Sequence, residues 1–203
     1  FIYSYTAPTV LRIAVGPVGS EDTRIVVAIL QTFAREKHPI RLRLVPSDSP
    51  LASAELLKVG KADLAIVRSD GNMPPNATTV AIMHRDAMLI MAPADKGINT
   101  IADLAGRRVG FLRGLVLNQK LLDLVLERNG IDSSQVEKVA LRPGDVHAAI
   151  RGGKIDAILN VGPPSGAVAS RTFTDLVTDD GRSPILLKLV DAEAIAQTYP
   201  ALE

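Results

Sequence analysis

Three arginines stand directly after apolar segments, at positions where they could bind an acidic group. Arg68, Arg113 and Arg142 each follow a short run that indicates a buried strand. A guanidinium group donates two parallel hydrogen bonds to a carboxylate or a similar anion. Ligands of open parallel sheets bind at the carboxyl ends of the strands. The pattern therefore predicts an anion-binding site formed by these loops.

Small polar residues follow the remaining predicted strands in the same way. The segment 16–20 (Gly-Pro-Val-Gly-Ser) follows the first strand, and segment 47–49 (Ser-Asp-Ser) follows the second. The free N–H groups at the helix starts that come next attract anions. The predicted ligand-binding residues are Gly16, Gly19, Ser20, Ser47, Ser49, Arg68, Ser69, Arg113, Arg142 and Asn160.

Bond-making chemistry is not indicated. The three histidines, His38, His84 and His147, lack metal-ligand spacing, and the chain has no cysteine. The first glycine-containing loop lacks the lysine and the spacing of a phosphate loop. Glu21 and Asp22 begin a predicted helix, where carboxylates are stabilised by the helix dipole. We therefore predict a binding protein that is not an enzyme and has no cofactor and no metal.

Composition narrows the class of ligand and partner. A net charge of +1 over 203 residues gives no electrostatic basis for nucleic-acid binding. Aromatic residues make up 3% of the chain and tryptophan is absent, so stacking on sugars or bases is disfavoured. No segment approaches the roughly 18 apolar residues of a membrane span. A small polar or anionic molecule is the expected ligand.

The order of predicted elements repeats. Strands at 11–15, 41–45 and 63–67 alternate with helices at 21–37 and 50–60, and the same order returns in strands 108–112, 136–141 and 156–160 with helices 116–128 and 144–151. Helix 116–128 places Leu117, Leu121, Leu124 and Val125 on one face. The order predicts an α/β protein with two lobes, each a mainly parallel sheet flanked by helices.

Further segments connect these lobes. Strands are expected at 80–83, 87–92 and 185–190, and helices at 163–170 and 191–199. The predicted organisation is an N-terminal extension at 1–10, a first lobe at 11–84, a second lobe at 85–165, and a return segment at 166–203 directed toward the first lobe. The extension resembles the exit from a signal sequence or membrane anchor.

A short motif occurs once in each lobe. Residues 57–66 (LKVGKADLAI) return 93 positions later at 150–159 (IRGGKIDAIL). Both copies contain Gly-Lys-x-Asp between a predicted helix and an apolar strand. Glycine permits the left-handed turn that ends a helix, and lysine favours the negative helix end. The motif therefore predicts two helix ends of the same kind, and a ligand cleft between the lobes.

Two segments resemble a known family. Residues 100–110 (TIADLAGRRVG) are similar to the segment that opens the second lobe of type II periplasmic solute-binding proteins. Residues 148–163, with Gly-Lys-Ile-Asp-Ala and a following Gly-Pro-Pro, resemble the TAXI receptors of TRAP transporters. The resemblance covers about residues 11–170. In place of that family's Gly/Thr/Tyr-rich first loop, this chain has only Gly16, Gly19 and Ser20 as counterparts.

The resemblance implies a solute receptor that closes by a hinge around a small organic anion or amino acid. Its partners would be the membrane subunits of a TRAP-type transporter. Its location would be periplasmic, secreted or anchored at the inner membrane, with tethering through a segment preceding the extension. A membrane-anchored sensory domain of the same fold, without a transport role, is the alternative.

Overall fold

The structure is a computed structural model that describes residues 7–68, 73–112 and 116–189. The chain divides into two compact units, Phe1–Met83 and His84–Glu203, and each is described by itself. The elements of the first unit are β1 (Thr9–Val15), α1 (Glu21–Arg35), β2 (Ile40–Pro46), α2 (Pro50–Lys58) and β3 (Leu64–Ala65). Those of the second unit are β4 (Ala87–Ala92), η1 (Ile101–Leu104), β5 (Arg108–Leu112), α3 (Val116–Arg128), η2 (Ser133–Gln135), β6 (Glu137–Leu141), η3 (Pro143–Asp145), α4 (Val146–Arg151), β7 (Ala157–Gly162), α5 (Ala167–Asp175) and β8 (Ile185–Leu186).

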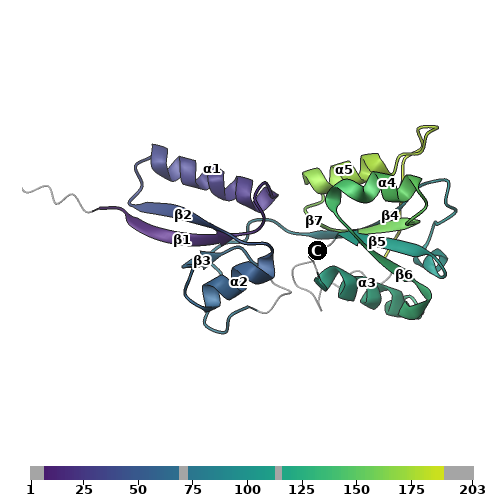
Figure 1. The fold of residues 1–203 in the computed structure, drawn as a ribbon, viewed down its shortest axis with the longest axis horizontal. Helices are drawn as coiled ribbons and strands as arrows, with labels where there is room; N and C mark the ends of the chain where they lie inside the picture. Colours follow the sequence, from purple (N-terminus) through teal and green to yellow (C-terminus); the bar gives the residue numbers. More distant parts are fainter. Residues whose placement is uncertain (1–6, 69–72, 113–115, 190–203) are drawn as a thin grey trace, which may run out of the picture. The chain divides into compact units, whose positions relative to one another are not determined.

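The first unit is a parallel sheet with strand order β2-β1-β3. The central strand β1 is in register with both neighbours, so that Ile13 lies beside Leu44 on one side and Leu64 on the other. The chain crosses from β1 outward to β2 and then back past β1 to β3, which places α1 and α2 on opposite faces of the sheet (Figure 1). The βαβαβ order predicted from the sequence is confirmed.

Helix α1 begins where its sequence provides a cap. Ser20 adopts an extended conformation and its side chain accepts a hydrogen bond from the N–H of Thr23. Gly19, just before the cap, has φ +85°, a left-handed conformation that disfavours side chains with a Cβ. The acidic first turn, Glu21 and Asp22, matches the positive end of the helix dipole.

The second unit has a five-stranded sheet of order β6-β5-β7-β4-β8. Strands β6, β5 and β7 are parallel and repeat the arrangement of β2, β1 and β3. Strand β4 runs antiparallel to β7 and to β8, so it alone has the opposite direction. The prediction of two mainly parallel sheets flanked by helices is therefore confirmed.

The core of the second unit lies on both faces of its sheet. One apolar cluster joins alternate residues of β7, such as Leu159, to α3 through Leu121 and Leu122. The other joins Ile158 to α4 through Ala149 and Ile150. Figure 1 shows α3 on one face and α4 with α5 on the other. A sheet covered on both faces explains why β7 is apolar at nearly every position.

Some element predictions differ from the structure. The helix predicted at 163–170 begins only at Ala167, because Pro163–Gly166 first forms a turn closed by the Gly166 N–H and the Pro163 carbonyl. No strand forms at 80–83, where Val80 and Ile82 are exposed. In the part of 166–203 that is described, α5 and β8 belong to the second unit. The predicted return toward the first unit and the helix at 191–199 would lie in 190–203, outside the described residues.

The repeated Gly-Lys-x-Asp motif ends α2 and α4 in the same way. Gly60 and Gly153 both have a positive φ, +69° and +65°. The N–H of the following lysine bonds to the carbonyl of Leu56 in one copy (2.9 Å) and of Ala149 in the other (2.7 Å). These contacts are typical of a glycine-terminated helix, as predicted.

The aspartate of the motif has a role that the sequence reasoning missed. Asp63 receives three hydrogen bonds from Arg12 of β1: one from the backbone N–H at 2.8 Å, and two from the guanidinium at 3.0 and 2.7 Å. Asp156 receives the same three from Arg108 of β5, at 3.0, 2.9 and 2.9 Å. Each pair, called here the Arg–Asp clamp, joins the entry of one strand to its parallel neighbour: β3 to β1 in the first unit and β7 to β5 in the second.

The clamp of the first unit makes stability depend on acidity. Hydrogen bonds from the Arg12 guanidinium and backbone hold the pKa of Asp63 at about 2. Because this pKa is lower than in the unfolded chain, the clamp stabilises the unit fully above about pH 4 and loses that effect as the pH falls toward 2. An NMR titration of the Asp63 carboxyl carbon should give a midpoint near 2, and Arg12→Met should raise it. A midpoint near 4 in the unchanged chain would contradict the clamp.

Candidate functional site

The first unit gathers several predicted residues at the carboxyl ends of β1 and β2. The backbone N–H and the Oγ of Ser47 each lie 2.9 Å from the carbonyl oxygen of Val15, which joins the two strand ends. Ser47 Oγ also lies 2.6 Å from Ser53 Oγ, on a residue with no exposed surface. The single Ser47 hydroxyl proton is therefore directed toward the protein. Its position indicates a structural role beneath the site rather than donation to a ligand.

Ser49 differs from Ser47 because, among the residues that the structure describes, its hydroxyl donates no hydrogen bond. It is the N-cap of α2, and its Oγ accepts a hydrogen bond from the N–H of Ala52 (3.2 Å). Accepting that bond leaves the hydroxyl hydrogen free to donate. Pro50 occupies the first turn of α2, which contains no acidic residue. The N-terminal end of α2 thus offers a donor and a positive dipole to an anion.

The N-terminal end of α1 is less suited to an anion. Ser20 Oγ accepts from the Thr23 N–H at 3.2 Å and lies 3.0 Å from Thr23 Oγ1, which in turn donates to the carbonyl of Pro17 at 3.1 Å. Glu21 and Asp22 add two carboxylates to this first turn. Those charges already compensate the helix dipole.

The predicted arginines have different surroundings. Arg68, after β3, is half-buried, whereas Ser69 and Arg113 lie outside the described residues. Arg142 has a side chain that is 76% exposed, and its Nε donates to the Asp145 carboxylate at 3.1 Å. This local ion pair occupies part of the guanidinium fork. A ligand-binding role for the three arginines stays a prediction.

Asn160 is the most unusual of the predicted residues. It lies on β7 opposite Leu89 of β4, and it is only 3% exposed. A polar side chain near the carboxyl end of a central strand suits a ligand contact.

The predicted residues therefore lie as follows. The first unit places Gly16, Ser20, Ser47 and Ser49 at one edge of its sheet. In the second unit, Arg142 follows β6 and Asn160 lies within β7, two residues before its end. Sequence reasoning missed Ser53 and Thr23, which hold the loop serines. The sequence did contain a signal for both. Thr23 lies three positions after the N-cap Ser20, and Ser53 lies four positions after the N-cap Ser49. The cleft between lobes stays a prediction.

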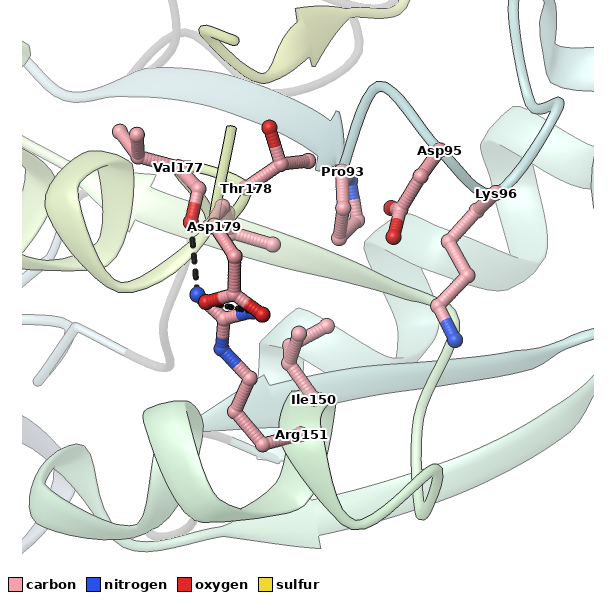
Figure 2. Close-up of a pocket in the computed structure, with 9 residues that line it drawn as sticks. Pro93, Asp95, Lys96, Ile150, Arg151, Val177, Thr178 and Asp179 are labelled. Atoms are coloured by element: carbon pink, nitrogen blue, oxygen red, sulfur yellow. Dashed lines mark hydrogen bonds and ion pairs between the residues drawn. The ribbon is translucent and has the colours of Figure 1, made fainter. Parts of the chain in front are cut away.

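A cavity of about 180 Å³ lies at the other edge of the second unit's sheet. Figure 2 shows Arg151 at the end of α4, with its guanidinium bonded to the Asp179 carboxylate at 2.8 Å and to the Val177 carbonyl at 3.0 Å. The lining residues are Pro93, Asp95, Lys96, Ile150, Arg151, Leu176, Val177, Thr178 and Asp179. None of the ten predicted residues is among them. The charges of the lining balance, and Arg151 already has partners that fasten α4 to the segment after α5.

Two of the three histidines, His38 and His84, contact neighbouring side chains, whereas His147 is exposed on α4. The ring of His38 stacks on Phe33 with centroids 4.5 Å apart, and its Nδ1 accepts from the Ile40 N–H at 3.2 Å. His84 lies 3.1 Å from the Asp86 carboxylate. The residues that the structure describes contain no group of three or more side chains arranged to hold a metal ion. Among the same residues, no helix combines the length and the apolar character needed to cross a bilayer.

Comparison with known proteins identifies relatives of the chain. Over 113 residues, it is 30% identical to the putative aliphatic sulfonates-binding protein of Escherichia coli K12, an alignment that covers 51% of this chain and 34% of that protein. The chain thus aligns with about a third of the length of this curated relative.

Solved structures share the fold. The periplasmic aliphatic sulphonate binding protein SsuA of Escherichia coli is 22% identical, with a TM-score of 0.62 over 96% of this chain and 68% of that chain. The putative sulfonate ABC transporter protein SsuA of Methylobacillus flagellatus KT is 19% identical, with a TM-score of 0.55 over 90% of this chain and 56% of that chain.

These relatives are binding proteins, in agreement with the prediction that the chain is not an enzyme. They support the resemblance to type II periplasmic binding proteins but not its narrowing to TAXI receptors. Residues 24–175 match the family described as NMT1/THI5 like. The chain therefore belongs to the NMT1/THI5-like family and has the α/β fold of the type II periplasmic binding proteins.

Proposed function

We propose that the chain is the binding part of a periplasmic solute receptor that captures an alkanesulfonate for an ABC-type importer. The observation that carries the proposal is the 30% identity to an aliphatic sulfonates-binding protein. The predicted TRAP-type transporter gives way here to an ABC importer, because a structural relative is described as part of a sulfonate ABC transporter. The sensory alternative stays a prediction that no observation favours.

The geometry of the first unit supports a singly charged anion. A sulfonate carries one negative charge spread over three oxygens, each of which accepts hydrogen bonds. Ser49 offers a free hydroxyl hydrogen at the N-terminal end of α2, with no carboxylate in that first turn. We place the sulfonate at this end of α2 rather than at α1, where Glu21 and Asp22 would repel it.

Isothermal titration calorimetry with alkanesulfonates of two to six carbons, dicarboxylates and amino acids tests this function. We expect binding of the sulfonates and weaker binding of the dicarboxylates. Absence of heat and of any thermal shift across the whole panel would rule the function out.

Ser49→Ala should weaken sulfonate binding by about tenfold to a hundredfold, because a hydrogen bond to a charged group contributes about 1.5–3 kcal/mol. It also removes the N-cap, so Ser49→Asp serves as the second variant: aspartate keeps the cap but repels the anion. Ser49→Asp should therefore retain stability while losing affinity. Ser183→Ala, an exposed serine in the second unit, is the control and should leave the Kd unchanged. Equal affinities for all four proteins would remove Ser49 from the site.

A further inference from the structure

Ser53 carries a buried hydroxyl that faces the loop beneath the candidate site. Its side chain has no exposed surface, and its Oγ lies 2.6 Å from Ser47 Oγ. Ser53 belongs to α2, whereas Ser47 directly follows β2. Among the described residues, the Ser53 hydroxyl makes no other hydrogen bond. Since a buried hydroxyl hydrogen without an acceptor is costly, the Ser53 hydrogen is directed to Ser47 Oγ.

The direction of this bond decides the direction of the next one. With Ser47 Oγ as acceptor, its own hydrogen is directed to the carbonyl of Val15, at 2.9 Å, or of Ser49, at 3.1 Å. The Val15 carbonyl also accepts from the Ser47 N–H at 2.9 Å. The Ser49 carbonyl also accepts from the Ser53 N–H at 3.0 Å. The two hydroxyls, called here the serine relay, thus join the interior of α2 to the end of β1 and to the backbone of Ser49.

The serine relay ends at the residue that offers the donor. Ser49 is held through its carbonyl by α2 and the relay, and through its Oγ by the Ala52 N–H at 3.2 Å. Its backbone and its hydroxyl oxygen are therefore both fixed before a solute arrives. A donor that is already in place costs less ordering when the ligand binds.

We propose that Ser53 is a positioning residue for the solute: through Ser47, its buried hydroxyl holds Ser49 in the conformation that donates to the anion. The inference rests on the proposed function. Ser53 has no exposed surface, so it acts without touching the ligand. Its contribution is the fraction of molecules in which the loop is ready to bind, because the apparent Kd equals the intrinsic Kd divided by that fraction.

Ser53→Ala should raise the Kd for butanesulfonate about fivefold, as expected for the loss of one ordinary hydrogen bond that holds the loop. The association rate should fall, because fewer molecules present Ser49 correctly, whereas the dissociation rate should change little. Ser49→Ala removes a direct contact and should instead raise the dissociation rate. Stopped-flow binding measures both rates. A lower Tm with an unchanged Kd for Ser53→Ala would make Ser53 purely structural and overturn the proposal.

A double-mutant cycle tests whether Ser53 acts through Ser47. Once Ser47→Ala has broken the serine relay, adding Ser53→Ala should not change the Kd further. A further fivefold rise would overturn the relay. The matched control is Thr178→Val in the second unit, since Thr178 is also buried and its hydroxyl accepts from the Arg182 N–H at 3.0 Å. This variant should lower the Tm and leave the Kd unchanged. A Kd raised as much as by Ser53→Ala would attribute both effects to general destabilisation and overturn the proposal.

Hydrogen exchange without ligand separates this inference from the proposed function. Ser53→Ala should speed exchange of the Ser47 amide, which bonds to the Val15 carbonyl, about fivefold. Unchanged exchange, in a protein that still binds butanesulfonate, would overturn the serine relay and leave the sulfonate receptor standing. Failure of the unaltered chain to bind any sulfonate would overturn the proposed function, and the positioning role with it.

Discussion

Leu121→Ala should lower the free energy of unfolding of the second unit by about 3 kcal/mol. Leu121 has no exposed surface and lies in the cluster between α3 and the sheet. Truncation removes three carbon atoms and leaves a cavity that neighbours such as Leu122 and Val125, also fully buried, cannot fill. Urea unfolding followed by circular dichroism measures the loss.

Leu124→Ala is the matched control on the same helix. Leu124 is only partly buried against the cluster, so its truncation should cost about 1 kcal/mol. If Leu124→Ala lowered the free energy of unfolding as much as Leu121→Ala, α3 would have to be rotated so that Leu124 is as deeply buried as Leu121.

Asp156→Ala should cost the second unit about 2 kcal/mol. The Asp156 side chain is 7% exposed, and its removal leaves the Arg108 backbone N–H and guanidinium without their acceptor. Burial raises the pKa of Asp156, but hydrogen bonds from Arg108 outweigh it and keep that pKa below its usual value, so the charge is present at neutral pH. Hydrogen exchange read by mass spectrometry should show faster exchange in β5 and β7.

Asp63→Ala removes the three equivalent hydrogen bonds from the first unit. It serves as the control for the effect of burial on the strength of the clamp. The side chains of Arg12 and Asp63 are 33% and 35% exposed, so water replaces the lost contacts more readily. We expect a smaller effect, confined to β1 and β3. Equal effects in the two units would show that burial does not determine the strength of the clamp.

The order and most boundaries of the elements could be predicted because local signals agreed. Helix 116–128 matches α3 at both ends, and strand 87–92 matches β4. The buried stripe of α3 was predicted less well. Leu122 and Leu126 have no exposed surface, whereas Leu124, which the prediction placed in the stripe, is only partly buried. A helix covering a wide sheet buries more positions than one narrow stripe shows.

Two errors have tertiary causes. Residues 80–83 form an apolar run like that of a buried strand, but a strand needs a neighbour, and none of the described strands pairs with them. The helix predicted at 163–170 begins late because Pro163–Gly166 forms a turn first, and proline suits both a turn and a first helical turn. In each case the local sequence allowed two structures, and packing decided.

The candidate site was predicted by position but not by role. The strand-end rule selected Ser47 and Ser49 together, and only the contact with Ser53 separates the inward hydroxyl from the available one. It also selected Asn160 without indicating that this side chain is buried. Whether a polar side chain has a hydrogen-bond partner depends on residues that are distant in sequence. The sequence alone does not show which residues those are.

The Arg–Asp clamps affect which mutations the two units can tolerate during evolution. Each clamp holds strand register where β3 or β7 begins, whereas the loops at the carboxyl ends of the strands, such as the one with Ser49, lie at the opposite edge of each sheet. Alterations of those loops leave the register-setting contacts in place. Such a protein can acquire a new ligand preference through mutations at one edge of each sheet. The contacts that set the strand register lie at the other edge and stay unchanged. The same division makes the loops the natural segments to randomise in a selection for altered specificity.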